Sequence, residues 1–133
     1  MSVKNHQILV VEDDEITIHI LNFLLSRENF EIRLAKDGNQ ALEVINHQPP
    51  TSAILLDVIL PYMSGLDLIP RIRQNSQWRN VPIIVLTTDT TEQHVIQALD
   101  AGADDYVLKP FRTGELMARL RRLLRSQSAI AAE

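Results

Sequence analysis

The chain has 133 residues, of which 45% are hydrophobic and 23% are charged, and it contains no cysteine. These values are typical of one globular domain, and the lack of cysteine excludes a disulfide framework, a thiolate metal site and a cysteine nucleophile. The formal net charge of −4 argues against a general nucleic-acid binder. The sequence shows neither a signal peptide nor a membrane-spanning stretch, so we expect a cytoplasmic protein that does not associate with membranes.

Short apolar runs alternate with segments of helical periodicity along the chain. Five apolar runs, at residues 8–11, 32–34, 54–56, 83–86 and 106–108, predict β-strands. Between and after these runs, apolar residues recur at spacings of three and four, which predicts amphipathic helices. The residues predicted to face the core are, in chain order, Ile16, Ile20, Phe23 and Leu24; Ala41, Leu42 and Ile45; Leu66, Ile69 and Ile72; Val95, Ile96 and Leu99; and Leu116, Leu120, Leu123 and Leu124.

The alternation of strand and helix, repeated five times, predicts an α/β domain. Such an order requires a parallel sheet with helices on both of its faces. Asp37 followed by Gly38 is typical of a turn and helix start, and Gly102 is typical of a helix end. We assign residues 1–126 to this domain and residues 127–133 to a flexible tail or the start of a linker.

Asp57 is the most informative residue, because it directly follows an unbroken apolar run. A run without polar alternation is typical of a strand that is covered on both faces, where a charge must be paired or functional. Three other predicted strands also run into polar residues: Glu12 and Asp13, then Thr87, then Lys109. In an open parallel sheet the carboxyl ends of the strands lie along one edge, where α/β proteins build their sites.

Three carboxylates at this edge, those of Glu12, Asp13 and Asp57, predict a divalent cation. Without a cation the three negative charges would repel one another, and an all-oxygen ligand set suits Mg²⁺. Zinc is not favoured, because the four histidines fall in different elements of the chain. The alternative is a metal-free site in which the acids cap the following helix.

Phosphoryl chemistry fits the same edge. An aspartate carboxylate can act as a nucleophile toward phosphorus, and the hydroxyl of Thr87 and the ammonium group of Lys109 can hold an anionic group placed on Asp57. Phosphoryl transfer needs mainly positioning and charge neutralisation, which a divalent ion and a lysine supply. No glycine-rich phosphate loop occurs in the sequence, so nucleotide binding is disfavoured.

Four segments in order, at residues 8–14, 55–65, 81–87 and 102–111, resemble the receiver domains of two-component response regulators. The resemblance extends over about residues 7–125. It implies the doubly wound (β/α)5 flavodoxin-like fold of the CheY-like superfamily, with five parallel strands in the order 2-1-3-4-5. It also implies an aspartyl phosphate, Mg²⁺ as the cofactor and a role in bacterial signal transduction.

Carried over residue by residue, the resemblance makes Asp57 the phosphorylated aspartate. Asp13 and Asp57 would bind Mg²⁺ directly, and the backbone carbonyl of Ile59 would complete the protein ligands. Glu12 would act mainly through water.

The resemblance also implies how the phosphoryl group is held and sensed. Thr87 and Lys109 would bind the phosphoryl oxygens, and Thr88 would contribute a backbone N–H. Tyr106 would be an aromatic switch that turns inward when Thr87 moves, with plain core packing as the alternative. The Lys109–Pro110 peptide bond would be cis, as it is in the family.

A dimer face on the fourth helix, fifth strand and fifth helix is a further implication. Its acidic and basic residues would be Asp104, Asp105, Glu115, Arg119 and Arg122. The basic residue usual on the fourth helix is replaced by Val95, which leaves Glu115 without its expected partner across the helices.

We therefore interpret the chain as a phosphorylation-dependent signalling switch. A histidine kinase or phosphotransfer protein would phosphorylate Asp57, and the change would reach a downstream effector, either a separate protein or a further domain of a longer transcriptional or enzymatic regulator. Enzymatic activity would be limited to self-phosphorylation from phosphodonors and autodephosphorylation. One rival is a small-molecule phosphatase, but Val58 and Ile59 leave no general acid shortly after Asp57. The other is a non-phosphorylated protein-binding pseudo-receiver, against which the complete set of site residues weighs.

Overall fold

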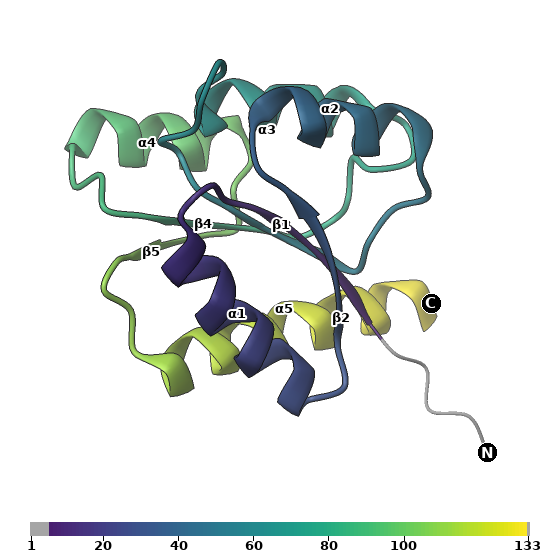
Figure 1. Ribbon diagram of the computed structural model, residues 1–133. Helices are drawn as coiled ribbons and strands as arrows, with labels where there is room; N and C mark the ends of the chain where they lie inside the picture. Colours follow the sequence, from purple (N-terminus) through teal and green to yellow (C-terminus); the bar gives the residue numbers. More distant parts are fainter. Residues whose placement is uncertain (1–5, 133) are drawn as a thin grey trace.

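The computed structural model describes the backbone of residues 6–132 and the side chains of residues 6–126. Five parallel strands form one sheet in the order β2-β1-β3-β4-β5 (Figure 1). This is the predicted α/β fold with the predicted strand order. The strands are β1 (Gln7–Val11), β2 (Glu31–Ala35), β3 (Ala53–Leu56), β4 (Ile83–Thr87) and β5 (Asp105–Leu108).

Five helices cover the two faces of the sheet. Figure 1 shows α1 and α5 below the sheet and α2, α3 and α4 above it. The helices are α1 (Glu15–Arg27), α2 (Gly38–His47), α3 (Gly65–Gln74), α4 (Glu92–Ala101) and α5 (Thr113–Ala132). The last helix extends into the segment 127–133 that the sequence assigns to a tail or linker. Among the described residues, no helix has both the length and the apolar character needed to cross a bilayer.

The central strands alternate their side chains between two separate cores. Ile54 belongs to the cluster beneath α2, α3 and α4, whereas Leu55 belongs to the cluster beneath α1 and α5. The same alternation places Leu9 in the first cluster and Val10 in the second. Because both faces are covered, both alternating sets of residues must be apolar, which explains the unbroken apolar runs in the sequence.

Two local predictions at helix ends are confirmed. The Asp37 side chain caps α2 by accepting a hydrogen bond from the Gln40 backbone N–H at 2.8 Å. Gly102 ends α4 with a φ of 120°, a conformation that L side chains rarely adopt.

The predicted core face of α1 is wrong for three of its four residues, whereas Leu24 is half-buried and packs against the core. Ile16 is 72% exposed and Phe23 is 59% exposed, whereas Thr17, Leu21 and Leu25 are buried. Two apolar stripes run side by side along this helix, and both satisfy helical spacing. The direction of the β1–α1 connection decides which stripe faces the sheet. Helical periodicity gives no information about that direction.

The predicted core face of α4 is also only partly correct. Ala98 is the buried residue of this helix, while Val95 is half-buried and Ile96 and Leu99 are exposed. A small side chain at the contact lets the helix lie close to the sheet, and the larger apolar residues are left at its margin.

A pair of alanine substitutions tests the corrected face of α1. Leu21→Ala is expected to lower the free energy of unfolding by about 2–5 kcal/mol, because it opens a cavity in the core. Ile16→Ala should change it by at most about 0.5 kcal/mol, because this side chain already faces water. Urea denaturation of the two variants and the wild type gives both values. An equal loss in the two variants would contradict the corrected face.

Candidate functional site

Three carboxylates meet at the carboxyl edge of the sheet. Glu12 and Asp13 follow β1, and Asp57 follows β3, which lies next to β1 in the sheet. One oxygen atom from each of the three residues lies within 4.8 Å of the others. Glu12 and Asp57 are buried and Asp13 is exposed. The structure therefore brings together the three acids predicted from the strand ends, with one of them open to solvent.

Lys109 reaches the buried acids from the end of β5. Its Nζ atom donates a hydrogen bond to Asp57 Oδ2 at 3.0 Å and another to Glu12 Oε1. Burial alone would lower the pKa of Lys109, but the hydrogen bonds to Glu12 and Asp57 and the charges of both carboxylates raise it above its ordinary value. The lysine is therefore a fixed positive charge between two buried acids.

Glu12 is held in place by hydrogen bonds as well as by the lysine. Its Oε2 atom accepts the backbone N–H groups of Asp13 and Asp14 at 3.1 and 3.2 Å. Burial raises the pKa of Glu12 to about 7, and the nearby charge of Asp57 adds to this effect, while the hydrogen bond from Lys109 opposes it. The ionised form of Glu12 is thus unfavourable at this position unless a positive charge lies close to it.

A different acid, Asp14, caps the following helix, α1. Its carboxylate accepts the backbone N–H of Thr17 at 3.0 Å and the hydroxyl of the same residue at 2.6 Å. Asp14 is the N-cap residue of α1, so Glu12 and Asp13 do not have the capping role considered as the metal-free alternative.

The loop after β3 packs closely against Asp57. The backbone N–H of Ile59 donates to Asp57 Oδ1 at 3.1 Å, and the Ile59 side chain points mostly into solvent. A Cβ atom on Gly65 would lie 2.1 Å from the backbone oxygen of Asp57, so only glycine fits there. Gly65 lies in the segment 55–65, but the sequence does not reveal this close approach, because it joins residues eight positions apart in the chain.

Thr87 and Tyr106 lie on neighbouring strands next to this cluster. Thr87 is fully buried, and its hydroxyl accepts the backbone N–H of Asp89 at 3.3 Å. Tyr106 is half-buried, and its hydroxyl donates to the backbone oxygen of Asp89 at 2.7 Å. Thr88 is exposed. The Lys109–Pro110 peptide bond is cis, in agreement with the expectation from the resemblance.

The residues predicted for a dimer face are brought together only in part. Asp105 pairs with Arg119 at 3.1 Å and with Arg122 at 3.9 Å. Arg119 also pairs with Glu115 at 2.9 Å within α5. Asp104 lies apart from these residues.

The partners of Asp104 lie on the α3 side of the sheet. Its carboxylate contacts Arg73 at 3.1 Å and accepts the backbone N–H of Ile83 at 2.8 Å. Asp104 precedes β5 and Asp105 begins it, and their side chains reach different helices, Asp104 toward α3 and Asp105 toward α5. Sequence proximity therefore overstated how many acids share the predicted face.

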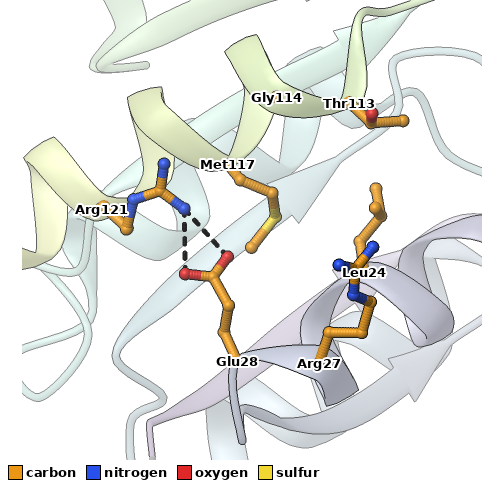
Figure 2. A pocket seen from close by; sticks show the side chains of 7 residues that line it. All are labelled: Leu24, Arg27, Glu28, Thr113, Gly114, Met117 and Arg121. Atoms are coloured by element: carbon orange, nitrogen blue, oxygen red, sulfur yellow. Dashed lines mark hydrogen bonds and ion pairs between the residues drawn. The ribbon is translucent and has the colours of Figure 1, made fainter.

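A cavity of about 320 Å³ between α1 and α5 is separate from this site. Figure 2 shows Arg121 of α5 and Glu28, just after α1, paired across it, with Met117 between the two helices. Its lining includes none of the acids, Thr87, Tyr106 or Lys109. This cavity is thus distinct from the acid cluster at the carboxyl edge of the sheet.

Comparison with known proteins agrees with the geometry. The family model of the response regulator receiver domain matches residues 8–121. The DNA-binding response regulator MtrA of Mycolicibacterium smegmatis is 40% identical over 133 residues, which are 100% of this chain and 57% of that protein. The chain thus spans little more than half the length of this curated relative.

Solved structures show the same fold. The receiver domain of a sensor histidine kinase from Pseudomonas aeruginosa, with a magnesium ion coordinated in the active site cleft, is 33% identical, with a TM-score of 0.82 over 91% of this chain and 98% of that chain. A CheY-like receiver domain protein from Methanospirillum hungatei is 25% identical, with a TM-score of 0.88 over 95% of this chain and 98% of that chain. The chain belongs to the response regulator receiver domain family.

Proposed function

We propose that Asp57 accepts a phosphoryl group from a histidine kinase or phosphotransfer protein, and that this modification switches the protein between two states. The observation that carries the proposal is the pairing of buried Asp57 with Lys109, beside two further acids at the carboxyl edge of the sheet. A buried carboxylate with a fixed cation next to it is suited to receive a group that carries more negative charge.

The donor atoms at this edge fit Mg²⁺. Three carboxylates with ligand atoms within 4.8 Å of one another form an all-oxygen set of the kind that Mg²⁺ prefers. The related receiver domain with magnesium in its cleft supports the choice of ion. Asp13, Asp57 and the backbone carbonyl of Ile59 would hold the ion, and Glu12 would act through water. The ion would neutralise charge on the phosphoryl oxygens during transfer.

In the proposed reaction a carboxylate oxygen of Asp57 attacks phosphorus. A C–O–P bond forms as the P–N bond of the donor phosphohistidine breaks, and the released imidazole nitrogen takes up a proton. Lys109, which contacts Asp57 already, binds a phosphoryl oxygen, and the Thr87 hydroxyl and the Thr88 backbone N–H bind the others. Hydrolysis of the acyl phosphate by water reverses the modification.

The proposed output surface is formed by α4, β5 and α5. When Thr87 turns toward the phosphoryl group, Tyr106 would follow and change this surface. Asp105, Glu115, Arg119 and Arg122 lie there and would serve a dimer of the phosphorylated protein, whereas Asp104 is directed toward α3. The names of the curated relatives suggest a DNA-binding effector domain in the whole protein, which would act in the cytoplasm.

The experiment that tests this function is phosphorylation by a small donor. With acetyl phosphate and Mg²⁺, the protein is expected to gain the mass of one phosphoryl group. The modification should not form when EDTA has removed the metal beforehand, because the acids and the incoming phosphoryl group then repel each other. Intact-mass spectrometry before and after each treatment measures the gain. No modification in Mg²⁺, or the same modification in EDTA, would contradict the proposal.

A further inference from the structure

Asp89 connects the phosphoryl-binding hydroxyl with the aromatic switch. Its backbone N–H donates to the Thr87 hydroxyl at 3.3 Å, and its backbone oxygen accepts the Tyr106 hydroxyl at 2.7 Å. The main chain of one residue therefore contacts both side chains that change in the proposed switch. A movement of the Asp89 main chain therefore alters both contacts together.

The side chain of Asp89 is tied to the first turn of α4. Its Oδ1 atom accepts the backbone N–H of Thr91 at 2.9 Å, and its Oδ2 atom is hydrogen-bonded to Nδ1 of His94. Thr91 occupies the N-cap position of α4, but its side chain makes no capping hydrogen bond. Asp89 thus satisfies a helix N–H that would otherwise lack a partner, and His94 holds the carboxylate that does so.

The protonation of this pair follows from its geometry. A carboxylate only accepts hydrogen bonds, so Nδ1 of His94 carries the hydrogen. The backbone hydrogen bond from Thr91, followed by the bond from His94, keeps the pKa of Asp89 below its ordinary value, so the carboxylate is ionised.

We propose that His94 is a positioning residue that holds the β4–α4 loop in its unphosphorylated arrangement by fixing Asp89. The inference rests on the proposed function, since it concerns how the switch at Asp57 is held. To turn its hydroxyl toward a phosphoryl group, Thr87 must give up the N–H of Asp89. The main chain of Asp89 cannot move with the Thr87 hydroxyl while α4 holds the Asp89 carboxylate. A contact made in only one of two states shifts the equilibrium toward that state.

The consequence is a measurable change in affinity for a phosphoryl mimic. Because His94 stabilises the state that does not bind the mimic, its removal should favour binding. One hydrogen bond of ordinary net strength corresponds to about a fivefold change.

Two substitutions separate the hydrogen bond from the presence of a side chain. His94→Leu removes the donor and retains bulk, whereas His94→Asn retains a side-chain N–H at a similar position. His94 is a suitable target because its side chain is 44% exposed, so neither change opens the core. His47→Leu is the matched control, because His47 also pairs with an acid, Glu43 at 3.2 Å, but on α2.

The experiment titrates each variant with beryllofluoride in Mg²⁺ and follows binding by NMR. His94→Leu is expected to bind about fivefold more tightly than the wild type, while His94→Asn and His47→Leu bind as the wild type does. Unchanged affinity in His94→Leu, or an equal increase in His94→Asn, would overturn the proposal.

A second measurement does not depend on the phosphoryl mimic. Hydrogen exchange of the Thr91 N–H should be faster in His94→Leu than in the wild type and should be restored in His94→Asn, because Asp89 is then held again. Unchanged exchange in His94→Leu would overturn the role of His94. Failure of the wild type to bind beryllofluoride at all, with the exchange result as expected, would overturn the proposed function alone.

Discussion

Asp57→Ala is expected to abolish phosphorylation of this protein by acetyl phosphate in Mg²⁺. The carboxylate of Asp57 is the proposed nucleophile, and alanine offers no oxygen to attack phosphorus. Asp57 is buried, accepts a hydrogen bond from Lys109 and follows β3, the middle strand of the sheet. Intact-mass spectrometry should show the full modification in the wild type and none in the variant.

The control for this substitution is another aspartate. Asp67 lies in the first turn of α3 and is exposed, so Asp67→Ala should be modified as fully as the wild type. Circular dichroism should show that Asp57→Ala remains folded, because Lys109 keeps Glu12 as a partner. Equal modification of Asp57→Ala and the wild type would exclude Asp57 as the acceptor and direct attention to exposed Asp13.

Thr87→Ala is expected to leave phosphorylation at Asp57 measurable but to remove the response at Tyr106 and α4. The nucleophile and its lysine remain in this variant, so the chemistry persists. The hydroxyl that contacts Asp89 and would turn toward the phosphoryl group is lost, so the modification no longer favours one arrangement of the loop over the other. NMR spectra with and without beryllofluoride should show shifts near Asp57 in both proteins but distant shifts only in the wild type.

Thr88→Ala provides the control, because the adjacent exposed threonine is proposed to act only through its backbone N–H. This variant should show the same distant shifts as the wild type. If Thr87→Ala also shows them, Thr87 is not the link, and the change must reach Tyr106 by another route.

The placement of the site could be predicted because it depends on strand ends. Four site residues directly follow an apolar run, namely Glu12, Asp57, Thr87 and Lys109. Parallel strands in one sheet bring their carboxyl ends to one edge. Asp57 and Lys109 are far apart in the chain, yet they follow β3 and β5, which are separated only by β4, and their side chains lie 3.0 Å apart. The complete apolar runs likewise predicted a sheet covered on both faces.

The face of α1 could not be predicted in the same way. Ile16 and Leu21 both lie on apolar stripes with helical spacing, and only the docking of the helix on β1 and β2 buries Leu21. The free energy of burial depends on the final position of the helix, which periodicity does not contain.

Pairs of side chains from different elements could also not be predicted from the sequence. Asp104 pairs with Arg73 of α3, and Asp89 pairs with His94 of α4, although neither spacing marks a pair.

The amino-acid sequence by itself determined the alternation of elements and the residues at the strand ends, because both follow from local apolar patterns. Only the tertiary structure decided which helix faces are buried and which charges meet, because these depend on distances between elements that are distant in the chain.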